Sequence, residues 1–254
     1  MLMLIVGIII GFVIGASVIE FLLPRAPRFF ETLFTKLDSG LRPETYCQIM
    51  DAVGWHMRNK GWYQLKFAKF MTTAPLLIDA GISKGEVLEI GPGPDYLGLE
   101  WLNNVTRANL VGIDNSIEMI GIATRNAHEY NKKAMYVAGD ADRMPFANQS
   151  FDAVFSSASL HEWGNPRQVF NEIYRILKPE GVYYIVDLKR NMALFSRFIV
   201  WLTAWPSSVR PHFLSSVKKA YTIKELRSIL DSSSLHEDKI TESWYSLIIT
   251  GKRL

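Results

Sequence analysis

The sequence predicts an α/β fold in which helices cover both faces of a doubly wound sheet. From about residue 76 onward, short apolar segments alternate with longer stretches that have helical spacing. The first apolar segment, Val87–Ile90, runs directly into a glycine-rich turn. Alternation of this kind is typical of βαβ units, which build parallel sheets with helices on both sides.

Five apolar segments are expected to form the parallel strands, and the stretches between them the helices. The helices are expected at Leu97–Asn103, Ser116–Tyr130 and Pro166–Leu177. In such a sheet a ligand binds beyond the carboxyl ends of the strands, where the first turn lies. The expected strands are Glu86–Ile90, Asn109–Asp114, Ala134–Ala138, Phe151–Ser156 and Gly181–Asp187.

The C-terminal part is expected to add one helix and an antiparallel edge. The helix opens at Tyr221–Leu226 and ends near Asp231. Leu235–Glu242 and Trp244–Thr250 then alternate enough to be strands. The result would be a mixed sheet of seven strands, the last one antiparallel.

Composition bounds the class of protein. The 254 residues allow one domain and an appendage, and a hydrophobic content of 48% is enough for a sizeable core. The net charge of +3 does not favour nucleic acid as a partner. The single cysteine, Cys47, excludes an internal disulfide and a multi-thiolate metal site, so no metal is predicted.

The first segment, Met1–Leu23, is nearly all apolar, and Glu20 is its only charged residue. It is long enough to span a bilayer as a helix. A cleaved signal peptide is the alternative, but no Lys or Arg precedes the apolar run and no clear cleavage site follows it. We therefore expect a retained single-pass anchor. Arg25 and Arg28 follow directly, which places the rest of the chain in the cytoplasm.

Three glycines in this segment, Gly7, Gly11 and Gly15, share one helix face. Small residues at this spacing let two membrane helices approach closely, so a homodimer could form through them. Glycine is also simply common in membrane helices, and both interpretations stay open.

Residues 24–75 carry eight basic residues against four acidic ones, interleaved with aromatic residues. This composition suits the surface of an anionic membrane leaflet. The alternative is a pair of helices that pack on the main domain and keep their lysines in solvent.

Three acidic residues follow successive expected strands. Glu89 lies at the end of the first strand, Asp114 ends the second, and Asp140 follows the third. A carboxylate at the position of Asp114 can accept both ribose hydroxyls of a nucleoside. One such acid is often only a helix cap. Three of them around one glycine turn favour a nucleoside-like ligand.

Six short runs occur in order along the chain: VLEIGPG (87–93), GIDNSIEM (112–119), GDA (139–141), PF (145–146), FD (151–152) and LKPEG (177–181). In this order and spacing they resemble the class I S-adenosylmethionine-dependent methyltransferases, in particular the small-molecule and quinone branch. The resemblance covers about residues 76–254 and implies a Rossmann-like fold with S-adenosyl-L-methionine as cofactor.

The resemblance also implies roles for individual residues. Glu89, Gly91 and Gly93 would shape the methionine end of the pocket, and Asp114 would hold the ribose. The adenine end would be contacted by the remaining residues, Met119, Asp140 and Ala141, with Asn115 also counted among the cofactor-binding residues.

Asp95 departs from the family pattern, which usually has a third glycine there. We expect that the backbone at Asp95 does not need a positive φ and that Pro94 stiffens the turn instead. The Asp95 carboxylate could also meet the ammonium group of the cofactor.

The best candidate for a general base is His161, in the loop after the fourth strand, which faces the expected methyl site. Family members often have a histidine near this point with a structural or pocket-lining role, so that interpretation stays open. His56 and His212 have no supporting pattern.

Several other chemistries are excluded. The sequence has no second histidine for a zinc-protease helix and no Gly-Lys-Ser/Thr phosphate loop. Tyr96 occupies the last glycine position of a Gly-x-Gly-x-x-Gly turn, which disfavours a nicotinamide cofactor. The loop after the fourth strand does not look like that of enzymes that methylate base amino groups, so nucleic acid is not expected.

Residues 188–220 contain no Asp or Glu, six basic residues and many aromatic ones. The apolar run is too short to span a bilayer, but such a helix can lie in the membrane interface. In the family this segment commonly forms part of the substrate cover. The alternative is a buried helix followed by a loop.

The sequence thus predicts an anchor (1–23), a basic aromatic segment (24–75) and a methyltransferase domain (76–254) with a substrate cover at 188–220. The expected reaction is methyl transfer to a lipophilic or membrane-proximal small molecule, such as a quinone-like compound, a lipid or a thiol. The competing interpretation is a non-catalytic, cofactor-binding scaffold or regulatory protein at the membrane.

Overall fold

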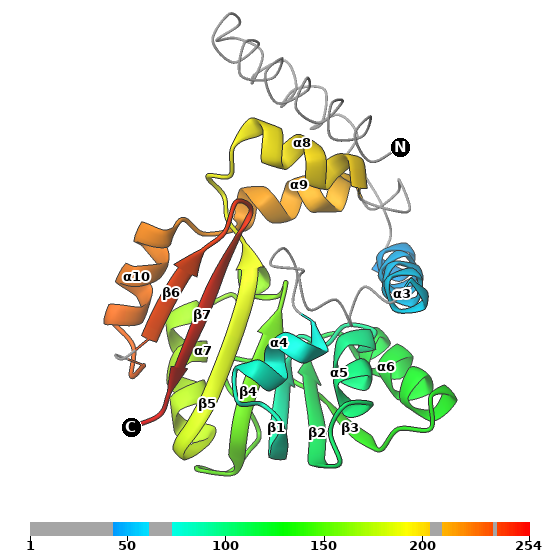
Figure 1. The fold of residues 1–254 in the computed structure, drawn as a ribbon, viewed down its shortest axis with the longest axis vertical. Helices are drawn as coiled ribbons and strands as arrows, with labels where there is room; N and C mark the ends of the chain where they lie inside the picture. The colour runs from blue at the N-terminus through cyan, green and yellow to red at the C-terminus, as the bar shows by residue number, and fades with distance from the viewer. Residues whose placement is uncertain (1–42, 61–72, 204–209, 236–237) are drawn as a thin grey trace, which may run out of the picture.

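A seven-stranded mixed sheet forms the centre of the molecule in the computed structural model, which describes residues 43–60, 73–203, 210–235 and 238–254 (Figure 1). The strand order is β3-β2-β1-β4-β5-β7-β6. The first five strands are parallel, and β7 is antiparallel to both of its neighbours. The strands are β1 (Lys84–Ile90), β2 (Arg107–Asp114), β3 (Ala134–Ala138), β4 (Phe151–Ser157), β5 (Leu177–Leu188), β6 (Asp238–Glu242) and β7 (Ser246–Lys252).

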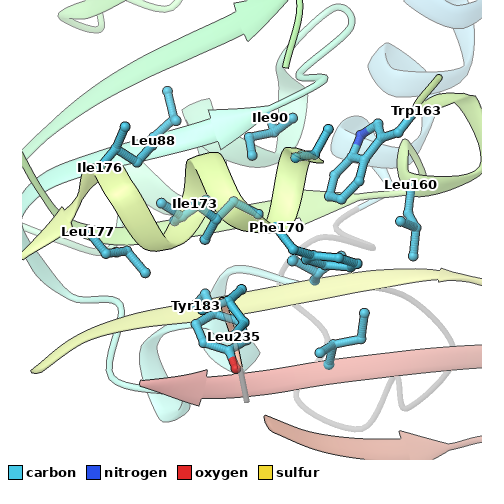
Figure 2. Close-up of a cluster of buried hydrophobic side chains, with 14 of the residues drawn as sticks. Leu88, Ile90, Leu160, Trp163, Phe170, Ile173, Ile176, Leu177, Tyr183 and Leu235 are labelled. Carbon is cyan, nitrogen blue, oxygen red and sulfur yellow. The ribbon is translucent and has the colours of Figure 1, made fainter. Parts of the chain in front are cut away.

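Helices cover both faces of the sheet, which confirms the predicted doubly wound arrangement. On one face, α4 and α5 pack against alternate residues of β1, β2, β4 and β5. On the other face, α7 and α10 enclose the larger core. Figure 2 shows the residues that β1 and α7 contribute to this core. These helices are α4 (Ala74–Asp79), α5 (Tyr96–Leu102), α7 (Pro166–Ile176) and α10 (Ile223–Asp231); α6 (Ile117–Glu129) follows β2 and contacts β3.

The alternation of side chains along β1 decides what each residue can reach. Leu88 and Ile90 point into the core that α7 covers, as Figure 2 shows, whereas Val87 lies in the core beneath α5. Glu89 therefore points toward α5, and it is a buried carboxyl in an apolar layer.

Two predicted strands begin more than two residues away from the observed start. β5 begins at Leu177 rather than Gly181, because Leu177 pairs with Phe151 across a register shift in β4. β6 begins at Asp238, so the expected strand from Leu235 is too long. Leu235 is instead buried in the core below α10. The residue before it, Ser234, donates its backbone N–H to the Asn171 side chain.

Helix α3 (Pro43–Asn59) packs on α5 and α6. The Asp51 carboxylate accepts hydrogen bonds from the Tyr96 hydroxyl at 2.9 Å, from Arg125 at 3.0 Å and from Asn126 at 3.1 Å. At the end of the helix, Arg58 pairs with Glu100 at 3.1 Å. For residues 43–60 the structure thus agrees with the interpretation of a helix packed on the main domain.

Helices α8 (Leu194–Thr203) and α9 (Arg210–Lys219) lie beyond the carboxyl ends of the parallel strands (Figure 1). Contacts of α9 with the loop after β4 place this segment beside the edge where a ligand is expected. Within the described part of the chain, none of the helices combines the length and apolar character that crossing a membrane requires. The predicted anchor Met1–Leu23, with Gly7, Gly11 and Gly15, lies outside the described residues.

We predict that Asp51→Ala lowers the free energy of unfolding by about 1–3 kcal/mol, because the buried Tyr96 hydroxyl loses its acceptor. Urea unfolding followed by circular dichroism measures this change. The matched control, Asp79→Ala, removes an exposed aspartate from α4 and should stay within about 0.5 kcal/mol of the wild type. Equal losses in both variants would show that Asp51 does not hold α3 in place.

Candidate functional site

The glycine turn after β1 is open on one side. Gly91 and Gly93 both have positive φ, of 66° and 54°. A side chain at Gly91 would collide with Ser159, at 2.5 Å, whereas one at Gly93 would meet nothing within 4 Å. The turn therefore packs against the loop after β4 at Gly91, and a ligand can approach its backbone closely at Gly93.

Asp95 adopts a left-handed backbone conformation, with φ 55° and ψ 41°. The expectation that this position needs no positive φ is therefore wrong. The turn keeps the geometry that a third glycine would have, and a residue with a side chain adopts it at a cost of about 1–2 kcal/mol. Two contacts hold it there, since the Asp95 N–H donates to the Pro92 carbonyl and the Tyr136 hydroxyl donates to the Asp95 carboxylate.

Glu89 and Asp95 form a pair of buried carboxyls beneath this turn. They are 3% and 1% exposed, and each has one oxygen without a hydrogen-bond partner among the described residues. The Glu89 and Asp95 oxygens lie 2.3 Å and 2.2 Å from the point where a Cβ at Gly98 would stand, so they face one another beside Gly98 of α5. Burial raises the pKa of both groups, and the neighbouring carboxyl raises that of Glu89 further; the pKa of Asp95 rises to about 6.

Asp114 connects the turn to the start of α6. One carboxylate oxygen accepts the Gly93 N–H at 3.1 Å, and the other accepts the Ser116 N–H at 2.9 Å. Burial raises the pKa of Asp114, although these two hydrogen bonds oppose the shift. The N-cap of α6 is Ser116, whose hydroxyl accepts the Met119 N–H, so Asp114 is not merely a helix cap.

The other predicted cofactor residues lie along the same edge. Met119 is buried against Cys47 of α3, and Asn115 is exposed beside Asp114. Gly139 follows β3 and donates its N–H to the Asp114 carbonyl, which brings the exposed Asp140 and the half-buried Ala141 next to the end of β2.

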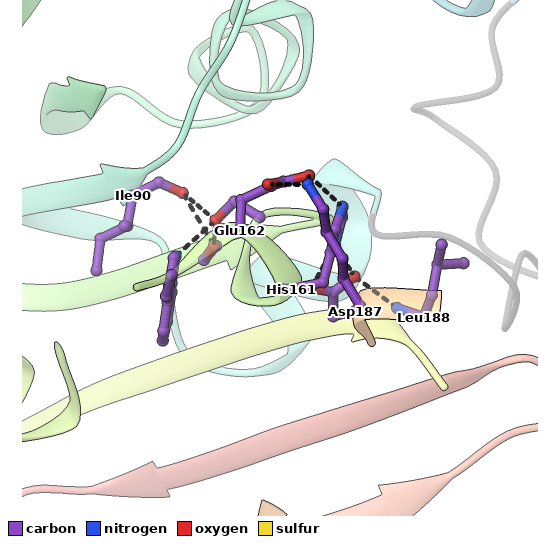
Figure 3. Close-up of polar contacts among 9 residues, drawn as sticks. Ile90, His161, Glu162, Asp187 and Leu188 are labelled. Atoms are coloured by element: carbon purple, nitrogen blue, oxygen red, sulfur yellow. Dashed lines mark hydrogen bonds and ion pairs between the residues drawn. The ribbon is translucent and has the colours of Figure 1, made fainter. Parts of the chain in front are cut away.

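His161 lies in the short helix η2 (Leu160–Glu162), which follows β4. The loop that leads to it is fixed on the end of β1, because the hydroxyls of Ser156 and Ser159 both donate to the Ile90 carbonyl, at 2.9 Å and 3.1 Å (Figure 3). The histidine is therefore held beside the glycine turn rather than on a free loop.

Asp187, at the end of β5, orients His161. The Nδ1 atom lies 2.9 Å from both carboxylate oxygens, and the His161 N–H donates to the same group at 2.6 Å (Figure 3). Burial alone would lower the pKa of His161, but the hydrogen bond and charge of Asp187, with Glu162 adding to them, hold that pKa above its ordinary value. Nε2 is 3.5 Å from Glu162, which pairs with Lys219 of α9 at 2.9 Å.

Sequence reasoning missed Asp187 as a site residue. The signal was present, because Asp187 is the last residue of an expected strand and so lies at the same edge as Glu89 and Asp114. The sequence does not show which residue Asp187 pairs with. His161 lies 26 residues earlier, after a different strand, and only the folded sheet brings the two together.

Tyr46 of α3 is a second residue that sequence reasoning missed. Its ring lies against that of His212 in α9, with centroids 4.8 Å apart. Burial raises the pKa of Tyr46, and the charges of Glu162, Cys47 and Asp114 raise it further, which places this side chain near both halves of the site. His56 lies in the last turn of α3.

The site fits a ligand with a nucleoside part and a cationic amino-acid part. Asp114 stands where it can accept ribose hydroxyls, Gly93 leaves space beside its backbone, and Glu89 and Asp95 supply buried negative charge. Comparison with known proteins agrees with this fit, since residues 88–185 match the family described as a methyltransferase domain. The match covers 98 of the 254 residues and supports S-adenosylmethionine-dependent methyl transfer by this segment.

Curated proteins similar to the methyltransferase domain act on different molecules. A demethylmenaquinone methyltransferase from Protochlamydia amoebophila is 33% identical over 110 residues, which cover 41% of this chain and 45% of that protein. A sterol 24-C-methyltransferase from Pneumocystis carinii is 33% identical over 111 residues, which cover 42% of this chain and 29% of that protein. The chain thus spans less than half the length of these relatives.

Solved structures share the fold of the methyltransferase domain. A SAM-dependent methyltransferase from Aquifex aeolicus has a TM-score of 0.55 at 19% identity, over 71% of this chain and 88% of that one. At this identity the likeness shows the fold alone. It agrees with the predicted Rossmann-like, seven-stranded mixed sheet.

We predict that Asp95→Gly stabilises the protein, and that the gain grows with pH. Glycine relieves the left-handed backbone at every pH. In addition, the raised pKa values of Glu89 and Asp95 mean that the folded wild type holds protons that the unfolded chain releases above pH 4. Wild-type stability is therefore lost as the pH rises through about 6.

Urea unfolding at pH 5 and pH 8 measures this difference, and we expect the gain at pH 8 to exceed that at pH 5 by roughly 2 kcal/mol. Tyr136→Phe serves as a control, since it removes the hydrogen bond to Asp95 and leaves both carboxyls in place. An equal gain in stability at both pH values would show that protonation of the two carboxyls is not linked to folding.

We also predict that Asp187→Asn lowers the pKa of His161, because burial then acts without the opposing carboxylate. NMR titration of the imidazole signals measures the shift, and His161→Ala identifies the signal. Glu162→Gln is the control and should lower the pKa less, because Glu162 is more distant and half exposed. An equal shift in both variants would contradict the role given to Asp187.

Proposed function

We propose that the protein transfers a methyl group from S-adenosylmethionine to a lipophilic small molecule at the cytoplasmic face of a membrane. The observation that carries this proposal is the meeting of two groups at one edge of the sheet. Asp114 and the glycine turn form a nucleoside site. Beside it, His161 lies on the loop that is bonded to the end of β1, and it pairs with Asp187 at the end of β5.

The cofactor supplies an electrophilic methyl group on a sulfonium ion, and the protein must hold it in line with the acceptor atom. Asp114 would accept the ribose hydroxyls with the lone pairs that its two backbone hydrogen bonds leave. Met119, Asp140 and Ala141 would contact the adenine. The remaining predicted residues, Glu89, Gly91, Gly93 and Asp95, would hold the methionine end, and Asn115 would lie beside the ribose.

His161 would act as a general base when the acceptor is an oxygen or nitrogen that carries a proton. The hydrogen bond from Nδ1–H to Asp187 leaves the lone pair of the neutral ring on Nε2. Asp187 also stabilises the ring after it takes up a proton. In this proposal Asp187 positions the base and does not itself touch the substrate.

The lipophilic substrate rests on two further observations. Among similar proteins, one acts on demethylmenaquinone and others on sterols, which are apolar molecules. The cover formed by α8 and α9 is basic and aromatic, and the Arg210 guanidinium lies 4.5 Å from the centre of the Trp201 ring. Residues of this kind suit the interface between lipid and water.

The membrane location extends this proposal to the segments outside the described residues. Met1–Leu23 would anchor the chain, residues 24–42 would lie against the anionic leaflet, and Gly7, Gly11 and Gly15 would bring two anchors together. The anchor would hold the cover of the site near a substrate that is dissolved in the bilayer.

The test is transfer of a labelled methyl group from the cofactor in host membranes, followed by partition into organic and aqueous phases. We predict label in the organic phase with the wild type and loss of at least ~100-fold with Asp114→Ala, because that variant removes the ribose acceptor and the link between Gly93 and α6. The matched control Asp231→Ala, at the exposed end of α10, should transfer as the wild type does.

Other outcomes separate the alternatives. Label that appears only in water-soluble products would keep the methyltransferase and contradict the lipophilic acceptor. Tight cofactor binding without transfer to any fraction would favour the non-catalytic, cofactor-binding scaffold.

A further inference from the structure

Burying Glu89 and Asp95 side by side lowers the stability of the folded protein. Asp95 is an acid in a left-handed conformation where glycine would be unstrained, and it faces a second buried carboxyl. Neither group has an ion pair within 4.0 Å among the residues that the structure describes. Stable folding alone does not explain two unpaired acids at this place.

Among the described residues, the groups that face the pair add no positive charge. On β3, the Tyr136 hydroxyl donates a hydrogen bond to Asp95. On β2, the Asp114 carboxylate contributes a third negative charge, and it is already engaged by Gly93 and Ser116. From α5, the backbone of Gly98 approaches the pair and donates a hydrogen bond to Asp95. Full ionisation would therefore leave like charges side by side in a buried site.

One proton resolves this conflict. Two carboxylates are both acceptors, so their facing oxygens have no donor to share. When one of the two groups is protonated, its hydroxyl donates to the other and both oxygens are satisfied. Burial raises the pKa of each group, which agrees with a proton that stays bound near neutral pH.

We propose that Glu89 and Asp95 share one proton in the cofactor-free protein, and that binding of S-adenosylmethionine releases it to solvent. The inference rests on the proposed cofactor site, which places the methionine end beside this pair. The cofactor's ammonium and sulfonium groups bring positive charge, so the second carboxylate ionises as the cofactor binds. The O–H bond of the carboxyl breaks, its electron pair stays on the carboxylate, and the proton passes to water or buffer.

Two consequences follow for the cofactor and the product. Because binding releases a proton, affinity for S-adenosylmethionine rises with pH, by up to ~10-fold per pH unit. The demethylated product, S-adenosylhomocysteine, has lost the sulfonium charge and releases less of the proton. The pair therefore favours the charged cofactor over the product, and this preference strengthens as the pH rises.

Calorimetric titration of the full chain in detergent tests the inference. S-adenosylmethionine is titrated at pH 6.5 in buffers that differ in ionisation enthalpy, and the slope of the observed heat against that enthalpy counts the protons released. The variants are Asp95→Gly, which restores a glycine that suits the backbone, and Asp95→Asn, which keeps the volume and removes the charge. Asp231→Asn removes an exposed charge far from the site and is the matched control.

We expect the wild type and Asp231→Asn to release close to one proton more than either Asp95 variant. The cofactor's own amino group titrates with all four proteins. The comparison therefore uses the difference in the number of protons released between wild type and variant. Over pH 6–8 the wild-type dissociation constant should fall with pH more steeply than that of Asp95→Gly. With S-adenosylhomocysteine, the difference in protons between wild type and Asp95→Gly should be smaller.

Equal proton release in wild type and Asp95→Gly, with both proteins binding the cofactor, would overturn the inference and leave the proposed cofactor site in place. The pair would then be a permanently protonated part of the core. A wild type that binds no S-adenosylmethionine at any pH between 6 and 8 would overturn the proposed function and this inference together.

Discussion

The two hydrogen bonds that Asp114 accepts organise the edge of the sheet on which the site depends. Parallel strands end at one edge by geometry alone, but their loops need a fixed arrangement before they can form a site. Asp114 provides it by binding the N–H of Gly93 in the first turn and the N–H of Ser116 at the start of α6. On the other side of the turn, the Ser156 and Ser159 hydroxyls in the loop after β4 donate to the Ile90 carbonyl. These bonds hold His161 at the same edge of the sheet.

The sequence predicted the features that depend on neighbours along the chain. Apolar periodicity placed the strands to within a few residues, and the third strand, Ala134–Ala138, agrees in full. The glycine turn and the acids at the strand ends pointed to the candidate site, and the structure joins the turn to Asp114 at one edge of the sheet. Predictions were weaker where a distant residue decides the structure, as at Leu177, which extends β5 by pairing with Phe151.

The same limit applies to the candidate site. Asp187 was placed correctly at the end of a strand, yet its role depends on His161, which comes from a different loop. Asp95 was noticed because it departs from a family pattern, but its backbone follows the glycine geometry because the turn is held by Pro92, Asp114 and Tyr136. Local residue preference was overruled by these contacts.

The contact between Tyr46 and His212 joins helices that are synthesised at different times. Helix α3 precedes the sheet in the chain, and its partners for Asp51 lie in α5 and α6, which emerge from the ribosome early. The ring of His212 belongs to α9, which emerges only after β5. The residues proposed for the nucleoside all precede α9 in the chain, so the contact between α3 and α9 can form only after they have been synthesised.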